Sequence, residues 1–268
     1  MDTNKQHIVW HDDNMMKQLI SYAIGCMMGR YRLDRPGLHI AHPNPSPEEL
    51  EPYEIDMLPE PVEGSCNSTN NPSPVTHHPS PSSFTIDDDG IIPLMPLDSG
   101  FPDCAAARMS EFVKLVFGEE QHAANMNFLQ EALGKDLETY FAKDFYTDHK
   151  KRYQNRPIYW LFASKKGAFQ CLVYMHRMTP FTVERIRSKY LLPYIERLAG
   201  RINDMNASIL QLTSAQARTL QKLERDLQEC REYHDLLHPV ANQNITIDLD
   251  DGVVVNYAKF GNVLAKLK

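Results

Sequence analysis

The chain has 268 residues, enough for one large domain or two smaller ones, and its formal net charge is −7. Its five cysteines are scattered and form no CxxC pair, which argues against a disulfide framework or a cysteine-based zinc site and favours a reducing cytoplasm. The first residues lack a secretory signal pattern, and the apolar run from Leu19 to Met28 is about half a bilayer span, so we expect a soluble cytoplasmic protein without membrane contact.

The N-terminal segment, residues 1–41, is expected to be helical. Residues 14–28 have the composition of a buried helix, Gly29 is placed to end it, and Pro36-Gly37 marks a turn. Composition then changes sharply, because residues 41–104 hold thirteen of the eighteen prolines and twelve acids but no Lys or Arg. We expect residues 42–84 to be a disordered acidic Pro/Ser-rich insertion, since Leu58–Ser83 has too few apolar side chains to offset its ordering entropy.

Residues 85–180 are predicted to combine helices with a β-hairpin. Apolar side chains recur at helical spacing over residues 104–117, 119–133 and 136–153. Residues 158–162 and 168–175 are rich in aromatic and β-branched side chains, which predicts two strands joined by a turn that carries Lys165, Lys166 and Gly167.

Residues 181–240 predict an antiparallel helical hairpin. Thr179-Pro180 opens a helix that Pro193 should kink or restart. Two apolar series at helical spacing are separated by Thr213–Gln216, which has the form of a capping box. In residues 241–268, apolar residues alternate on both sides of Asp251-Gly252 and predict a C-terminal β-hairpin followed by a short helix. The fold class is therefore mainly α with small β-hairpins, that is, α+β.

Positive charge is concentrated in one aromatic-rich segment. Between Lys150 and Lys189 the chain has ten basic residues and one acid, Glu184. A basic, aromatic-rich segment in an acidic chain indicates a surface for a polyanion, and we expect that polyanion to be nucleic acid. The alternative is a solvated face whose Lys and Arg stems cover an aromatic core.

Motifs for catalysis are not found in the sequence. No glycine-rich phosphate loop, GxSxG or HExxH motif occurs, and His234–His238 lacks the glutamate of a metalloprotease helix. Asp87-Asp88-Asp89 suits a solvated turn better than a cation site. We therefore expect no catalytic, cofactor-binding or metal-binding residues.

Six segments resemble, in the same order, the carboxy-terminal region of PglX, the large adenine-specific DNA methyltransferase family of BREX phage-defence systems. These are LISYAIGCMMGRYRLDRPG, DDDGIIPL, EFVKLVFGEE, FYTDHKKRYQNRPIYWLF, LVYMHRMTP and IDLDDGVVVNYAKF. The family's glycine-bearing cofactor loop and its Asn-Pro-Pro-Tyr motif are absent from this sequence. The resemblance thus implies a fragment without its own catalytic motifs, in a family that uses S-adenosylmethionine.

The resemblance also implies partners: double-stranded DNA, and either the methyltransferase domain of a parent protein or other subunits of the defence complex. Together with the charge pattern, it assigns phosphate contacts to long cations that flank or tip the predicted hairpin. These are Lys150, Lys151, Arg152, Arg156, Lys165, Lys166 and Arg177. The alternative is a non-catalytic helical module, in which the helices of residues 181–238 dock a partner subunit and the cations are solvated surface.

Overall fold

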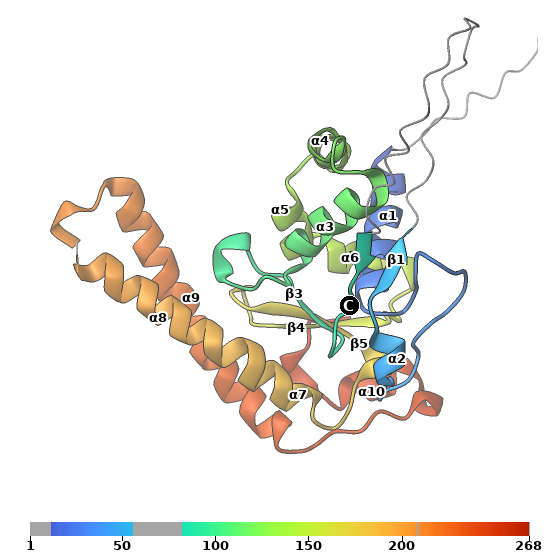
Figure 1. The fold of residues 1–268 in the computed structure, drawn as a ribbon. Helices are drawn as coiled ribbons and strands as arrows, with labels where there is room; N and C mark the ends of the chain where they lie inside the picture. Colours follow the sequence, from blue (N-terminus) through green and yellow to red (C-terminus); the bar gives the residue numbers. More distant parts are fainter. Residues whose placement is uncertain (1–11, 56–81, 208, 268) are drawn as a thin grey trace, which may run out of the picture.

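The computed structural model describes residues 12–55, 82–207 and 209–267 (Figure 1). Its strands are β1 (Tyr53–Ile55), β2 (Ser82–Phe84), β3 (Ile91–Pro93), β4 (Tyr159–Ala163) and β5 (Gln170–Tyr174). Its helices are α1 (Asp12–Met27), α2 (Pro47–Leu50), α3 (Ala105–Phe117), α4 (His122–Leu133), α5 (Leu137–Lys143), α6 (Phe145–Arg152), α7 (Thr182–Arg185), α8 (Leu192–Ala207), α9 (Ser214–Ala241) and α10 (Gly252–Ala258). The mainly helical class with small antiparallel sheets is confirmed.

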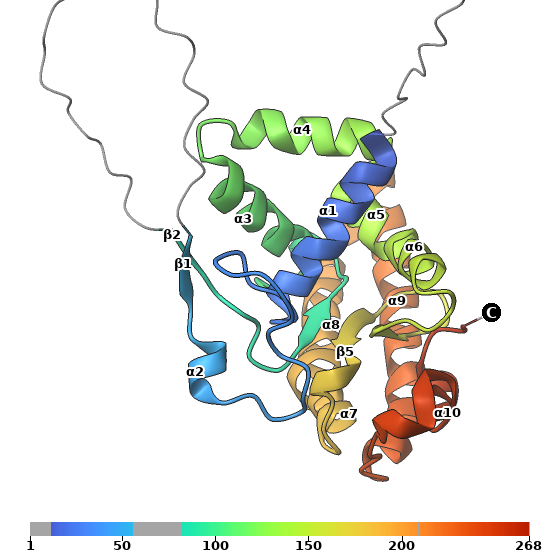
Figure 2. The same cartoon turned by 90° about the vertical axis from the view of Figure 1, so that its right-hand side faces the viewer.

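A three-stranded antiparallel sheet, in the order β3-β5-β4, lies at the centre of the fold. Because side chains alternate between the two faces of a strand, β4 points Tyr159 and Leu161 to one side and Trp160 and Phe162 to the other. Helices α1 and α3–α6 cover the first face, and α7–α10 cover the second (Figures 1 and 2). The sheet therefore separates two apolar cores and is buried on both faces.

The predicted hairpin of residues 158–175 is confirmed as β4 and β5, joined by a turn in which Gly167 has φ +83°. The predicted helix over residues 136–153 is divided at Asp144 into α5 and α6. A feature that the sequence did not indicate is β3, which extends the hairpin to three strands.

The helical hairpin near the C-terminus is confirmed as α8 and α9, which extend away from the body of the molecule (Figure 1). Thr213 caps α9: its hydroxyl accepts from the N–H of Gln216 at 3.3 Å, while the Gln216 side chain accepts from the N–H of Thr213 at 2.8 Å. The apolar series predicted for this hairpin included Ile209 and His234, but Ile209 is 55% exposed, and Tyr233 is buried in place of its neighbour His234. A π-helical turn over Ile186–Leu191 joins α7 to α8 just before Pro193, which has no N–H to donate.

The predicted C-terminal β-hairpin is wrong. Leu249–Asp251 forms a 3₁₀ turn that leads directly into α10. The side-chain amide of Asn256 donates to the carbonyl of Gly252 at 2.9 Å and accepts from the N–H of Asp248 at 3.1 Å, which closes this helical turn. Tyr257 and Phe260, three residues apart, then both pack edge-on against Trp160, a pairing that a strand would place on opposite faces.

The predicted disordered range, residues 42–84, begins and ends in regular structure. Helix α2 and strand β1 lie at its start and β2 at its end, with Tyr53 paired to Phe84 across the small sheet β1–β2. Both rings are buried, and their centroids are 5.7 Å apart. Residues 56–81, which include most of the Pro/Ser-rich stretch, lie outside the described residues. Within the described ranges, no helix is both long enough and apolar enough to cross a membrane.

Candidate nucleic-acid interface

The last turn of α6 and the loop that follows it present a basic group just before β4. Lys151, Arg152 and Arg156 are exposed and form no ion pair among the described residues. Cations at a helix C-terminus also interact favourably with the helix dipole. Lys150 differs, because its Nζ donates to the carbonyl of Lys266 at 2.9 Å and lies 5.3 Å from the centroid of the Tyr146 ring. It tethers the C-terminal segment.

The turn between β4 and β5 presents the second basic group, Lys165 and Lys166. Both side chains are exposed. Glu229 of α9 fixes the turn: its carboxylate accepts from the hydroxyl of Ser164 and from the N–H of Lys166, each at 2.6 Å. Partial burial acts to raise the pKa of Glu229, but these hydrogen bonds prevail and lower it, so the carboxylate is ionised. The turn is therefore held rigidly against α9.

A cavity of about 620 Å³ lies between this turn and α9. Lysine, arginine and acidic side chains line it together: Lys165, Lys166, Lys222, Arg225, Asp226, Gln228, Glu229 and Glu232. Lys222 is paired with Asp226 at 2.9 Å. An anion inside this cavity would lie near carboxylates as well as cations. Lys165 and Lys166 are therefore better placed to bind phosphates that lie outside the cavity, at its edge.

Arg177 lies in the interior and not on the surface. Its side chain is 3% exposed, and its guanidinium donates to the carbonyls of Met28 at 3.2 Å, Asp87 at 2.7 Å and Asp88 at 2.7 Å. A guanidinium occupied by three carbonyls in this way is not placed to reach a phosphate. Arg177 instead joins the end of α1 to the acidic turn before β3.

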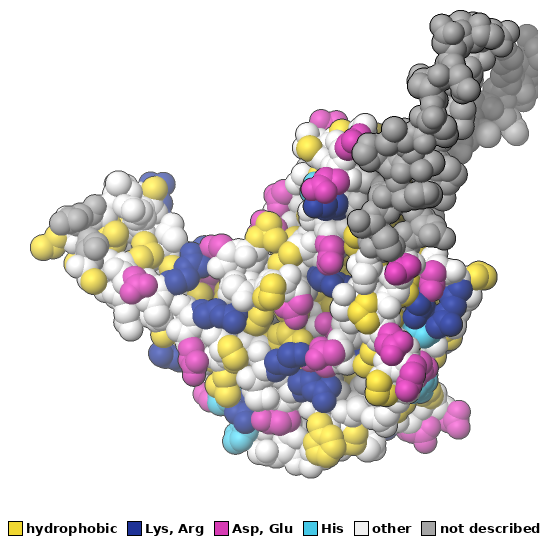
Figure 3. Space-filling view, viewed as in Figure 1, with side chains coloured by type: hydrophobic (Ala, Val, Ile, Leu, Met, Phe, Trp, Pro, Cys, Tyr) yellow, Lys and Arg dark blue, Asp and Glu magenta, His cyan; other side chains and the backbone are white. Residues whose placement is uncertain are grey.

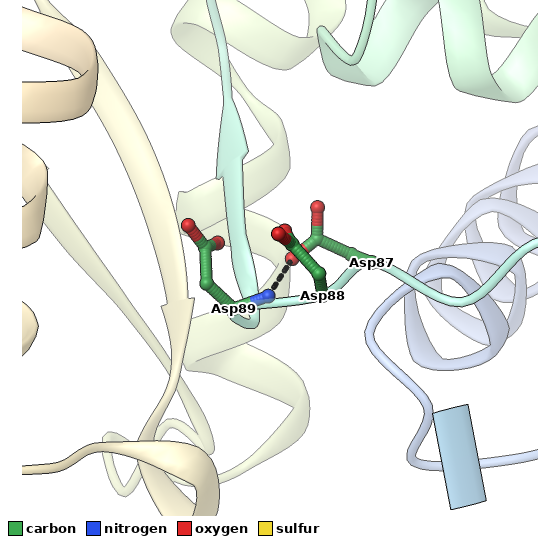
Figure 4. Close-up of side chains that lie close together, drawn as sticks. All are labelled: Asp87, Asp88 and Asp89. Carbon is green, nitrogen blue, oxygen red and sulfur yellow. Dashed lines mark hydrogen bonds between the residues drawn. The ribbon is translucent and has the colours of Figure 1, made fainter. Parts of the chain in front are cut away.

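The acidic turn, Asp87-Asp88-Asp89, brings its carboxylate oxygens within 4.8 Å of one another (Figure 4). Asp87 accepts from the N–H groups of Asp89, Gly90 and Ile91. Burial, and then the neighbouring Asp89, raises the pKa of Asp87 to about 8, while Arg177 opposes this rise. Asp89 accepts from Lys189 at 2.9 Å and from the Tyr190 hydroxyl at 3.1 Å. Protein donors already satisfy these carboxylates, so the turn is structural.

The basic segment of residues 150–189 is thus divided among several surroundings. Arg187 pairs with Glu184 at 2.7 Å, and Lys189 pairs with Asp88 at 3.1 Å. On the face shown in Figure 3, basic and acidic side chains are interspersed. Of the seven predicted phosphate contacts, five are exposed and without an ion pair among the described residues: Lys151, Arg152, Arg156, Lys165 and Lys166.

Nucleophilic cysteine chemistry finds no support in the described residues. Cys26, Cys104, Cys171 and Cys230 are free and buried. Burial raises the pKa of each thiol, to about 12 for Cys26 and Cys230, so all four are protonated at neutral pH. Cys66 lies outside the described residues.

Sequence reasoning did not include Arg32 and Arg35, which the fold places beside Arg152. A second cavity, of about 570 Å³, brings these arginines together with three tyrosines. The available signal was the run Arg30–Arg35, which holds three arginines and a tyrosine directly after α1.

No protein-family model matches the chain. All of the chain aligns, with 39% identity over 287 residues, to 22% of the adenine-specific methyltransferase BrxX of Escherichia coli O9:H4 (strain HS). Similarly, 91% of the chain aligns, with 32% identity over 260 residues, to 19% of the adenine-specific methyltransferase PglX of Lacticaseibacillus casei (strain Zhang). The resemblance predicted from the sequence is confirmed, and the chain spans about a fifth of the length of these curated relatives.

Proposed function

We propose that this chain, a homologue of one region of the adenine-specific methyltransferases, is a DNA-contacting and scaffolding part of an adenine-N6 DNA methyltransferase of a BREX phage-defence system. The observation that carries the proposal is the pair of exposed basic groups, Lys151, Arg152 and Arg156 at one end of β4 and Lys165 and Lys166 at the other. The family supplies the substrate class, and the basic groups supply a means of holding it.

The spacing of the two groups suits an extended polyanion. Residues 157–164 run between them, and at about 3.3 Å per residue this stretch spans roughly 20–30 Å. Along the helix axis of a duplex, each strand has one phosphate per 3.4 Å, so that distance corresponds to roughly six to nine base pairs. The sheet is buried on both faces, so the separation between the groups is fixed. Phosphate contacts at both ends would set the register and orientation of a duplex without reading its sequence.

In this proposal, methyl transfer from S-adenosylmethionine belongs to the parts of the relatives that the chain does not cover. The sequence has no glycine-rich cofactor loop and no Asn-Pro-Pro-Tyr motif, and the chain spans about a fifth of each relative. An enzyme that acts on a base must hold the duplex while the nucleotide is extruded. This chain would supply some of those DNA contacts, and its two hydrophobic cores would hold the contacting residues in place.

The test is duplex binding by the 268-residue chain, measured by fluorescence anisotropy at low salt. Lys165→Glu/Lys166→Glu and Lys151→Glu/Arg152→Glu should each weaken binding about tenfold or more, because each double substitution removes two phosphate contacts and adds repulsion. The matched control is Lys143→Glu/Arg218→Glu, which makes the same charge change on α5 and α9 at exposed residues that form no ion pair among the described residues. Equal loss in the control and the two test variants would show a general charge effect and refute the assignment.

A second function, docking of a partner protein, is favoured by the tip of the α8–α9 hairpin. Leu210 is 99% exposed and Ile209 is 55% exposed, although both are large and apolar. Removing the whole of residues 181–238 would not test this, because α7–α9 supply much of the second core. Leu210→Ser leaves that core intact. Loss of co-purification with the methyltransferase region, without loss of duplex binding, would support docking at the tip.

A further inference from the structure

A concave surface between α1, the loop after it and the end of α6 differs in charge from the cavity at the hairpin turn. Its volume is about 570 Å³, within the usual range for small-ligand sites. Three arginines and three tyrosines contribute to its lining: Arg32, Arg35, Arg152, Tyr22, Tyr31 and Tyr153. Among the described residues that line it there is no carboxylate. We call this surface the Arg–Tyr cleft.

The tyrosine rings of the Arg–Tyr cleft are held in place. Tyr22 and Tyr31 stack with their centroids 5.5 Å apart and their planes 23° apart. The Tyr22 hydroxyl donates to the carbonyl of Arg32 at 3.3 Å, and the Tyr31 hydroxyl accepts from Arg30 Nε at 2.9 Å. The Tyr31 ring lies directly on α1 where residue 25 is glycine, since a Cβ there would be 2.5 Å from the ring. Tyr22 remains 40% exposed, so part of the ring pair is open to a ligand.

Two of the three arginines have charge available for an anion. Arg32 is used within the fold: it pairs with Asp34 at 2.7 Å and lies 4.1 Å from the centroid of the Tyr53 ring. Arg35 and Arg152 are exposed and form no ion pair among the described residues. The neighbour of Arg35 is His39, whose Nδ1 is 2.7 Å from Arg35 Nη2. Burial lowers the pKa of His39, so this ring is a neutral acceptor that adds no charge of its own beside Arg35.

We propose that the Arg–Tyr cleft binds an unpaired nucleotide of a nucleic-acid strand, with the base against the exposed face of Tyr22 and the flanking phosphates on Arg35 and Arg152. Stacking on an aromatic ring beside cations that track the backbone is the general mode of single-strand recognition. An acidic peptide would use the arginines but not the rings, so the rings favour a nucleotide. The inference does not depend on the duplex contacts proposed above, because it uses different residues except Arg152.

The test uses the 268-residue chain and two probes of equal length, a fluorescent thymidine 12-mer and a 12-base-pair duplex. Tyr22→Leu keeps an apolar side chain but removes the stacking face, and should weaken single-strand binding by about 5-fold to 100-fold. Arg35→Gln should lower the magnitude of the single-strand salt slope by about 0.7. Duplex affinity should change less than about twofold in both variants, whereas Lys165→Glu/Lys166→Glu should weaken the duplex and spare the 12-mer.

Crosslinking locates the contact independently of affinity. A 12-mer with one 5-bromouracil, irradiated with the wild-type chain, should crosslink to Tyr22, Tyr31 or Tyr153, and mass spectrometry identifies the residue. Crosslinks confined to other parts of the chain would overturn the proposal, as would unchanged 12-mer affinity in Tyr22→Leu. A glutamate oligopeptide that competes as well as the 12-mer would also overturn it, by showing a general anion site. Failure here leaves the duplex test at Lys165 and Lys166 unaffected.

Discussion

Replacing Arg177 by leucine tests the division of the basic segment into buried and exposed members. Arg177 is 3% exposed and donates to three main-chain carbonyls, those of Met28, Asp87 and Asp88. Leucine fills part of the volume but offers no donor. The three carbonyls lose their partner, and Asp87 loses the positive charge that opposes the rise of its pKa.

The cost follows from the buried groups left unsatisfied. Each buried polar group without a partner costs roughly 1–3 kcal/mol. Asp88 is exposed, so water can hydrogen-bond to its carbonyl in place of Arg177. The total loss of unfolding free energy is therefore about 3–6 kcal/mol. For a domain of this size, about 1 kcal/mol shifts the melting temperature by roughly 2–4 °C. The expected loss for Arg177→Leu is therefore roughly 10–20 °C.

Circular dichroism melts and duplex anisotropy, run on the same samples, separate the two roles. The matched control is Arg156→Leu, at an exposed position of the loop between α6 and β4. It should melt within about 2 °C of wild type and bind duplex more weakly, since surface substitutions rarely change stability much. Arg177→Leu, assayed well below its melting temperature, should bind duplex within about twofold of wild type. Unchanged melting with weakened binding in Arg177→Leu would refute the buried role.

Two further predictions concern stability. Burial lowers the pKa of His149 to about 3, and its Nε2 accepts from the N–H of Tyr159 at 3.1 Å. The folded pKa is thus below the unfolded value of about 6.5. The stabilisation from the neutral ring is therefore complete above pH 6.5 and is lost as pH falls towards 3, by up to roughly 4–5 kcal/mol. In urea unfolding, the stability of His149→Gln should depend less on pH than that of wild type, and parallel curves would contradict this. Asn256→Ala removes the amide that closes the turn at the start of α10. Because Asn256 is buried, the substitution should lower the free energy of unfolding, measured in urea, by about 1–3 kcal/mol. A change below about 0.5 kcal/mol would contradict that role.

Local signals predicted the parts of the fold that depend on near neighbours in sequence. The capping box at Thr213 and the β4–β5 hairpin need only side chains a few residues apart. In the C-terminal segment, local signals did not predict the secondary structure. Alternating apolar residues around Asp251-Gly252 suit a hairpin, but packing of Tyr257 on Trp160, about a hundred residues earlier, selects a helix.

The candidate interface was predictable in part for the same reason. Charge counting found the two exposed basic groups, because Lys and Arg at a helix end or a turn are usually solvated. It did not separate Arg177 from them, since the carbonyls that bind Arg177 belong to Met28 and the acidic turn, some ninety or more residues away. The Arg–Tyr cleft could not be predicted from the sequence either, because Arg35 and Arg152, which both line it, are far apart in the chain.

The salt dependence of duplex binding tests the central claim most directly. If Lys151, Arg152, Arg156, Lys165 and Lys166 each hold a phosphate, the logarithm of the affinity should fall against the logarithm of salt concentration with a slope of about −4 to −5. Each double charge reversal should reduce the magnitude of that slope by about 1.8, and the two combined by about 3.6. A slope that stays the same in the combined variant would show that the groups at the ends of β4 do not contact the DNA backbone.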